Sequence, residues 1–251
     1  MIICKHQKDI DAARPKGTRI GFVPTMGALH EGHLSLIEIA KEHSDFVIVG
    51  IFVNPTQFAP GEDFEAYPRD IDRDTELLKK AGVDCLYLPQ VDEIYPDGVK
   101  VTIKAGEAAK GLETDFRPHF FDGVCSVVHR LFTIVQPDIA VFGEKDYQQL
   151  MVIREMAERH AMDIEIIGAP IVRDDTGLAL SSRNAYLSNT DIDVAKQLNA
   201  ILRSDLPTPE ALIDAGFDKV DYIEKRWGRI LAAAWIGKTR LIDNLTISAQ
   251  I

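Results

Sequence analysis

Two histidines and two glycines follow a short apolar segment near the start of the chain, and their types and spacing suit phosphate chemistry. His30 and His33 lie three residues apart, with Gly27 and Gly32 beside them. The apolar segment Ile20–Val23 predicts a buried strand that ends at a proline, and apolar residues at helical spacing after Gly32 predict a helix. The glycines allow a tight turn that brings backbone close to a ligand. Free N–H groups and the dipole of the helix start would attract an anion there. The histidines add hydrogen-bond donors that could stabilise the negative charge that develops on a leaving phosphate.

Other interpretations of this segment remain open. A zinc motif H-E-x-x-H places its histidines four residues apart in a helix, whereas His30 and His33 are three apart at a turn. The segment is neither a P-loop nor a G-x-G-x-x-G turn, because the required lysine and glycines are missing. Either histidine alone could simply cap the helix. Both histidines and both glycines after one strand favour a phosphate site, and we predict no protein-bound metal.

The composition is that of an ordinary globular chain. The 251 residues are 46% hydrophobic and 27% charged, enough for one large or two modest domains. The net charge of −11 argues against a nucleic-acid partner, so an anionic substrate requires a locally positive site. The three cysteines, Cys4, Cys85 and Cys125, are widely spaced, which favours reduced thiols. We find no membrane-spanning run or signal peptide and expect a cytoplasmic protein without a membrane partner.

Short apolar runs alternating with helical patterns predict an α/β fold with a parallel sheet. We expect this domain over residues 1–175 and a small α+β domain over 176–251. The polar segment 106–118 suits a mobile loop near the site. Expected strands cover residues 20–23, 46–53, 85–88, 100–104, 139–142, 163–168, 220–224, 231–235 and 241–247, and expected helices begin near His33 and cover about 71–81, 121–135, 147–160, 191–203 and 209–215.

Two glutamines are candidates for holding a small polar substrate. Gln57 follows the end of the strand 46–53, where open α/β sheets bind ligands, and Gln149 lies near a helix start. A primary amide both donates and accepts, so it can hold a carboxylate oxygen and a hydroxyl at once. Gln57 could instead be a surface loop residue. Gln149 could form a capping box with Asp146.

Cationic and hydroxyl side chains follow two further predicted segments. Lys145 comes just after the strand 139–142 and favours a phosphate contact, although a lone lysine is usually solvated. Asp146 could accept from ribose hydroxyls or cap its helix. Ser181, Ser182 and Arg183 follow a predicted turn and, taken alone, would indicate an ordinary loop.

These motifs together resemble a known family. The string Pro24-Thr25-Met26-Gly27-Ala28-Leu29-His30-Glu31-Gly32-His33, the segment Asn54-Pro55-Thr56-Gln57-Phe58, and the patterns Gly-x-Lys-Asp-x-x-Gln at 143–149 and Leu-Ser-Ser-Arg-Asn at 180–184 are similar to the pantothenate synthetase (pantoate–β-alanine ligase) family. This family belongs to the H-x-G-H nucleotidyltransferase superfamily. H-x-G-H alone would be weak evidence, whereas the ten-residue string is specific.

The resemblance implies a Rossmann-like nucleotidyltransferase domain, followed by a small C-terminal lid domain. It implies ligation of pantoate to β-alanine through a pantoyl adenylate, with ATP as a substrate, Mg²⁺ as its metal, AMP and pyrophosphate as products, and a homodimer. His30, His33 and Lys145 would be catalytic, and Gln57 and Gln149 would hold pantoate, Gln57 also bordering β-alanine. The implied ATP-binding residues are Met26, Gly27, Ala28, Leu29, His30, Glu31, Gly32, His33, Gly143, Glu144, Lys145, Asp146, Val172, Leu180, Ser181, Ser182 and Arg183.

The chain departs from the family pattern at Arg117-Pro118-His119-Phe120-Phe121, where Arg-Pro-Gly-His-Phe is expected. Two other functions compete with a pantoate ligase. A nucleotidyltransferase acting on a phosphate-bearing substrate should surround that substrate with Arg or Lys, and the neutral Gln57 and Gln149 argue against it. A non-catalytic nucleotide-binding protein on the same fold would have no need for the full set of His30, His33, Lys145 and Arg183.

Overall fold

Two units make up the structure, a computed structural model that describes residues 1–58, 64–65 and 67–247. The first unit comprises Met1–Glu144 and Gln148–Ala169, and the second comprises Lys145–Tyr147 and Pro170–Ile251. Each unit has its own sheet. The functional division into residues 1–175 and 176–251 stays a prediction.

Six parallel strands form the sheet of the first unit, in the order β1-β4-β3-β2-β5-β6. Helices and 3-10 turns connect them, as the predicted α/β class requires. The strands are β1 (Ile2–Cys4), β2 (Ile20–Thr25), β3 (Phe46–Ile51), β4 (Cys85–Tyr87), β5 (Ile139–Gly143) and β6 (Glu165–Ala169). The helices are α1 (Gln7–Ala13), α2 (Glu31–His43), α3 (Ile71–Lys80), α4 (Val91–Ile94), α5 (Glu113–Phe116), α6 (Phe120–Val135) and α7 (Tyr147–Arg159), with 3-10 turns η1 (Pro55–Gln57), η2 (Glu107–Ala109) and η3 (Glu144–Asp146).

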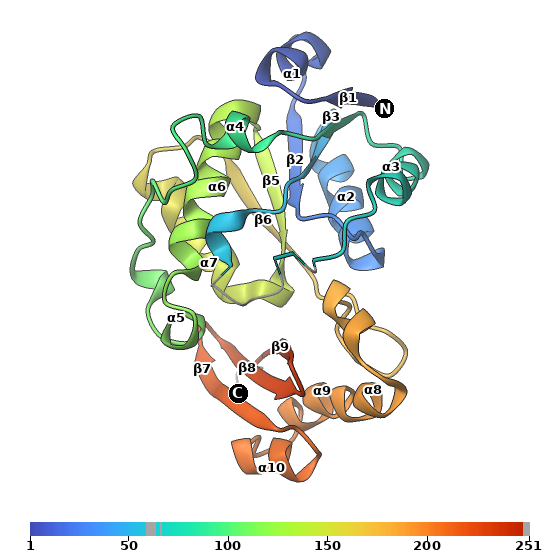
Figure 1. Ribbon diagram of the computed structural model, residues 1–251, viewed down its shortest axis with the longest axis vertical. Helices are drawn as coiled ribbons and strands as arrows, with labels where there is room; N and C mark the ends of the chain where they lie inside the picture. The colour runs from blue at the N-terminus through green and yellow to red at the C-terminus, as the bar shows by residue number, and fades with distance from the viewer. Residues whose placement is uncertain (59–63, 66, 248–251) are drawn as a thin grey trace. The chain divides into compact units, whose positions relative to one another are not determined.

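Apolar residues on both faces of the sheet explain why its central strands are apolar almost throughout. Val23 of β2 packs in one core cluster with Ile37 of α2 and Leu78 of α3. The neighbouring Phe22 instead contacts Phe132 of α6 edge to face, at 6.4 Å between ring centroids. Figure 1 shows α2 and α3 on one side of the sheet and α6 on the other.

The second unit has an antiparallel sheet in the order β7-β8-β9. Alternate residues of β8, among them Ala232 and Ala234, pack against Leu198 and Leu212 of the helices, so the helices cover one face of this sheet. This is the predicted small α+β unit. Its elements are η4 (Ser182–Tyr186), α8 (Asn189–Ala195), α9 (Gln197–Leu202), α10 (Pro209–Asp214), β7 (Lys219–Arg226), β8 (Arg229–Ile236) and β9 (Thr239–Thr246).

Several local predictions were wrong for physical reasons. Strand β2 continues through Pro24 to Thr25, because its ladder to β5 ends at Phe22 and does not require the missing N–H. Residues 100–104 form no strand; the N–H groups of Thr102 and Ile103 donate to the Ser126 hydroxyl instead. The three-residue β1 and the helix α1 were not foreseen.

The segment 106–118, which we predicted as a mobile loop, contains the short elements η2 and α5. Its mobility stays a prediction. Buried Gln148 accepts from the Glu113 N–H and donates to the carbonyls of Ala108, Ala109 and Gly111. A side chain distant in sequence thus supplies hydrogen bonds that the segment's own pattern does not reveal. The sequence also predicts a polar loop, rich in proline, glycine and acidic residues, between Phe58 and Asp70. Residues 59–63 and 66 of this loop lie outside the described residues. In the described part of the chain, no helix is long and apolar enough to cross a membrane.

Candidate active site

Three adjacent strands of the first unit end where the predicted motifs begin. Strand β2 lies between β3 and β5. Along the chain the sheet extends from β2 through β3 to β4, and the next connection crosses back to place β5 on the other side of β2. The switch point of the sheet therefore lies between β2 and β5. Open parallel sheets bind ligands at the carboxyl ends of strands at such a point. Residues 26–33 follow β2, Gln57 lies in η1 after β3, and Gly143 ends β5 with Glu144 next to it.

The two histidines form the N-terminal cap of α2. His30 is the N-cap residue, and its Nδ1 accepts from the Gly32 N–H at 3.1 Å. His33 Nδ1 accepts from the His30 N–H at 3.3 Å, and the two ring centroids are 4.1 Å apart. When Nδ1 of a neutral imidazole accepts, the ring proton is on Nε2. Both histidines thus cap the helix, and the caps fix both rings in the tautomer whose Nε2–H is a donor. A phosphate contact of these donors stays a prediction.

A buried carboxylate holds the turn before these histidines. Asp74 of α3 is fully buried, and its two oxygens accept from the N–H groups of Ala28 at 2.8 Å and Leu29 at 2.9 Å. Ala28 has a φ of 52° and Gly27 a φ of 83°, a left-handed geometry that costs free energy for alanine. Asp74 therefore stabilises a strained turn next to the predicted phosphate site. We did not foresee it, although the sequence carries a signal: Asp74 occupies a position on the apolar stripe of α3, between Ile71 and Leu78.

We expect Asp74→Ala to lower the free energy of unfolding by about 3–5 kcal/mol, because two charge-assisted hydrogen bonds are lost and two buried N–H groups lose their acceptor. Asp74→Asn keeps one acceptor oxygen and should cost less. Urea titration followed by circular dichroism measures both. Asp70→Ala is the matched control, since Asp70 also accepts a backbone N–H of α3 but is exposed. Equal losses in Asp74→Ala and Asp70→Ala would contradict the role given to Asp74.

The two predicted glutamines differ in their surroundings. Gln57 is buried; its Oε1 accepts from Asn54 Nδ2 at 3.2 Å, and its Nε2 lies 2.9 Å from the sulfur of Met26. The structure therefore brings Gln57 next to the first residue of the predicted ATP turn. Gln149 is half-buried, and its side chain makes no hydrogen bond within the described residues, so the capping box with Asp146 is absent. Its neighbour Gln148 is the structural glutamine.

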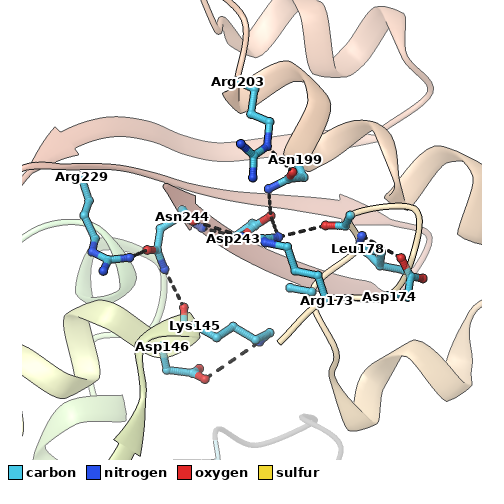
Figure 2. A network of polar contacts seen from close by, with 12 residues as sticks. Lys145, Asp146, Arg173, Asp174, Leu178, Asn199, Arg203, Arg229, Asp243 and Asn244 are labelled. Carbon is cyan, nitrogen blue, oxygen red and sulfur yellow. Dashed lines mark hydrogen bonds and ion pairs between the residues drawn. The ribbon is translucent and has the colours of Figure 1, made fainter. Parts of the chain in front are cut away.

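In the second unit, a polar network anchors the segment that carries Lys145. Figure 2 shows Asn244, which is 1% exposed, donating from Nδ2 to the Lys145 carbonyl at 3.0 Å. Asn244 Oδ1 in turn accepts from Arg229 at 2.7 Å. The Arg229 guanidinium also stacks on Tyr147, with its carbon 4.2 Å from the ring centroid. Lys145 Nζ lies 3.9 Å from Asp146 Oδ2. The Lys145 carbonyl is thus held by Asn244 of β9, and the side chain of the nearby Tyr147 by Arg229 of β8.

The same network secures the base of the predicted serine loop. Arg173 pairs bidentately with the buried Asp243 at 2.7 Å for both contacts (Figure 2). The chain turns at Asp174, whose carboxylate accepts from Thr176 and Leu178, as predicted for this turn. Bidentate pairing with arginine fixes geometry as well as charge.

The turn brings several predicted ATP-binding residues together within this unit. The Leu180 N–H donates to the Val172 carbonyl at 3.0 Å, so these two predicted residues are neighbours. Ser181 then caps η4 by accepting from the Arg183 N–H at 3.3 Å. Ser182 and Arg183 lie in η4 itself. Leu180–Arg183 is therefore a structured loop and not a random surface segment.

The departure at residues 117–121 does not distort the backbone. His119 stands where the family pattern led us to expect glycine, and its φ of −91° is one that any residue adopts. Arg117 donates to the carbonyl of Gln57 at 3.3 Å and stacks on Phe120, with 4.0 Å from its guanidinium carbon to the ring centroid. The loop therefore still contacts the Gln57 segment without the glycine.

The three cysteines are free and fully buried in the first unit. Burial raises the pKa of Cys125 to about 12 and also raises the pKa values of Cys4 and Cys85. The reactive thiolate is therefore disfavoured at all three positions. None of them has the properties of a nucleophile, in keeping with the predicted reduced thiols.

Comparison with known proteins gives a consistent result. The sequence profile described as pantoate-beta-alanine ligase matches residues 3–246. The chain belongs to the pantoate–β-alanine ligase family. It is 51% identical to the pantothenate synthetase of Mesorhizobium japonicum, over 93% of this chain and 92% of that protein. It is 44% identical to that of Caulobacter vibrioides, over 98% and 96% of the two chains.

Solved structures agree with this family. The pantoate-beta-alanine ligase of Francisella tularensis, complexed with beta-gamma ATP and beta-alanine, has a TM-score of 0.92 and 42% identity, over 99% of this chain and 98% of that chain. The pantothenate synthetase of Thermus thermophilus has a TM-score of 0.90 and 40% identity, over 98% and 99% of the two chains. The predicted family, enzyme class and fold are confirmed. The chain is a ligase of pantothenate biosynthesis.

Proposed function

We propose that the chain joins pantoate to β-alanine in two steps, with MgATP as the second substrate of the first step. The carboxylate of pantoate attacks the α-phosphorus of ATP, which forms a pantoyl adenylate and releases pyrophosphate. The amine of β-alanine then attacks the acyl carbon, which forms the amide and releases AMP. Neither step needs a nucleophile from the enzyme, which suits a chain whose cysteines are buried.

The observation that carries this proposal is the pair of capped histidines at the switch point of the sheet. Their Nδ1 atoms are both used by the backbone, which leaves the ring proton on Nε2 in the neutral form. Two N–H donors side by side at a helix N-terminus suit a pyrophosphate on which negative charge grows. They are also fixed before the substrate arrives, so no reorganisation is needed in the transition state.

The remaining residues have complementary roles in the proposal. Lys145 neutralises charge on the α-phosphate, while Ser182 and Arg183 bind the outer phosphates. The other predicted ATP-binding residues line the nucleotide site and contact ATP through their backbone. Gln57 and Gln149 hold pantoate. In proteins, Mg²⁺ is usually bound by substrate phosphates and one or two carboxylates, so it enters here as part of MgATP.

The alternative function, a nucleotidyltransferase with a phosphate-bearing acceptor, would require different side chains at the acceptor site. A nucleotidyltransferase with a phosphate-bearing acceptor needs cations around that acceptor, and the amides of Gln57 and Gln149 do not supply them. The complex of the Francisella tularensis relative with an ATP compound and β-alanine supports the ligase instead. The cytoplasmic location and the homodimer are part of the proposal as well, and the dimer rests on the family resemblance. Light scattering of the purified chain tests it.

Pyrophosphate release tests the adenylate step directly. The chain is mixed with MgATP and pantoate, first without and then with β-alanine. A burst of about one pyrophosphate per active site without β-alanine, followed by turnover when it is added, is the expected result. Pyrophosphate release that depends on β-alanine from the first turnover would contradict a separate adenylation step.

We expect Gln149→Arg to bind pantoate at least as tightly as the parent chain and to form adenylate at least about 10-fold more slowly. An arginine pairs with a carboxylate bidentately and holds its charge in place, whereas this carboxylate must donate electrons to phosphorus. An interaction that is stronger in the ground state than in the transition state slows the step. Equilibrium dialysis of pantoate and single-turnover pyrophosphate release give the two quantities.

A Gln149→Lys variant is the control for added positive charge without a bidentate fork. Lysine has a similar reach but contacts one carboxylate oxygen at a time. A loss of activity in both variants would therefore indicate steric disruption of the site, and a loss in Gln149→Arg alone would indicate bidentate pairing with the carboxylate. Near-parental adenylation by Gln149→Arg would show that neutral recognition does not protect the nucleophile.

A further inference from the structure

Behind Gln57 lies a buried network that the proposed mechanism does not use. Asn54 is 1% exposed and Tyr95 is 6% exposed. Asn54 follows β3 and caps η1, which contains Gln57. Tyr95 directly follows α4, far along the chain. Buried polar side chains persist when their hydrogen bonds are satisfied, and their geometry is then well defined.

The contacts around Asn54 allow only one orientation of its amide. Its Oδ1 accepts from the Tyr95 hydroxyl at 2.5 Å, from Thr56 Oγ1 at 3.1 Å and from the Thr56 N–H at 3.4 Å. Its Nδ2 donates to the Gly123 carbonyl at 3.2 Å. A flipped amide would place an NH₂ group against the Thr56 N–H and an oxygen against the Gly123 carbonyl. A donor would then face a donor at Thr56, and an acceptor would face an acceptor at Gly123.

The orientation of Asn54 determines the orientation of Gln57. The second hydrogen bond of Asn54 Nδ2 goes to Gln57 Oε1 at 3.2 Å. The carbonyl of Gln57 is therefore used inside the protein, and its NH₂ group lies against the sulfur of Met26. A thioether sulfur is a weak acceptor, so a substrate oxygen that replaces it gains a stronger hydrogen bond.

We propose that Tyr95 is a positioning residue that acts through Asn54 to present Gln57 to the acid substrate as a donor only. At this point the site then recognises an accepting oxygen, either of a carboxylate or of a hydroxyl that donates elsewhere. An ammonium group, which only donates, has no acceptor on Gln57. This revises the expectation that the Gln57 amide both donates to and accepts from the substrate. The inference rests on the proposed function in one respect, namely that Gln57 contacts pantoate.

The state of Tyr95 agrees with this role. Burial raises the pKa of its phenol, so the hydroxyl keeps its proton and remains a donor in neutral solution. The aromatic ring is fixed independently, since it lies 6.4 Å from the ring of Phe52 between centroids. Removing the hydroxyl alone therefore leaves the packing in place.

The decisive variant is Tyr95→Phe, and the chain offers a matched control. Tyr87 is fully buried too, but its hydroxyl has no hydrogen-bond partner within the described residues. We expect Tyr95→Phe to raise the KM for pantoate about 10-fold, as the loss of one or two neutral hydrogen bonds would, with the KM for ATP within about 2-fold of the parent. Tyr87→Phe should leave both unchanged. A general loss of packing would instead move both KM values and the thermal midpoint.

A double-mutant cycle shows whether Tyr95 acts through Gln57. Gln57→Ala alone should raise the KM for pantoate, and adding Tyr95→Phe should change it no further. If Gln57→Ala leaves the KM for pantoate unchanged, the substrate contact in the proposed function is wrong. If Gln57→Ala raises it but Tyr95→Phe does not, or if the two effects add, the positioning role is wrong. If Tyr95→Phe cannot be recovered folded, Thr56→Val, which removes another donor to Asn54 Oδ1, replaces it in the cycle.

Discussion

Replacing Lys145 by alanine is expected to slow pyrophosphate release from MgATP and pantoate about 100- to 1,000-fold. Loss of one fixed group that stabilises developing charge typically raises a barrier by about 3–4 kcal/mol. The Lys145 side chain is only 20% exposed, so its charge is poorly screened by water. Its backbone carbonyl is held by Asn244, and this anchor does not involve the side chain. The variant should therefore fold normally.

Lys196→Ala is the control for losing a lysine from the same unit. Lys196 Nζ pairs with Asp193 at 2.9 Å on the surface, and such pairs contribute little. Single-turnover rates of pyrophosphate release by both variants, with their thermal midpoints of unfolding, test whether Lys145 acts in the chemical step. A Lys145→Ala rate within about 3-fold of the parent would remove Lys145 from the chemistry.

Replacing His33 by asparagine is expected to slow the same step by two to three orders of magnitude while preserving the start of α2. The amide oxygen of asparagine lies near the position of Nδ1 and can still accept from the His30 N–H, a contact of 3.3 Å in the parent. The Nε2 donor is lost, and with it a contact worth about 3–4 kcal/mol at the transition state. His33→Ala loses both contacts, so it should be equally slow and also less stable by about 1 kcal/mol.

His33→Gln is the complementary variant, since its amide nitrogen reaches the region of Nε2. It should retain more activity than His33→Asn and cap the helix less well. Rapid-quench kinetics and urea unfolding of the three variants separate the two functions of this ring. If His33→Asn reacts at the parental rate, the ring only caps the helix.

The elements and motifs that were predicted correctly depend on nearby residues. The apolar runs of β2, β3 and β5 and the ten-residue string that ends at His33 are local signals, and the sheet then brings them to one edge. Such periodicity is the strongest evidence a single sequence carries. The family resemblance added roles to these residues that the spacing alone would not give.

Several missed features depend on partners that are far apart in the sequence. Asp74 holds the N–H of Ala28, 46 residues away, and Tyr95 holds Asn54, 41 residues away. No local pattern selects these pairs, because they meet only after the sheet has formed. The same reason explains segment 106–118, where the hydrogen bonds come from Gln148.

The short segment Lys145–Tyr147 limits how this enzyme can be divided. The chain passes between its two units at 144/145, at 147/148 and at 169/170. A truncation after Ala169 would therefore keep Lys145 but remove Asn244 and Arg229, the residues that fix its backbone and its neighbour Tyr147. The C-terminal unit is consequently not an interchangeable module. Chimeras between relatives that swap it at a single junction would pair the lysine of one parent with the anchor of the other, so residues 145–147 must be exchanged together with it.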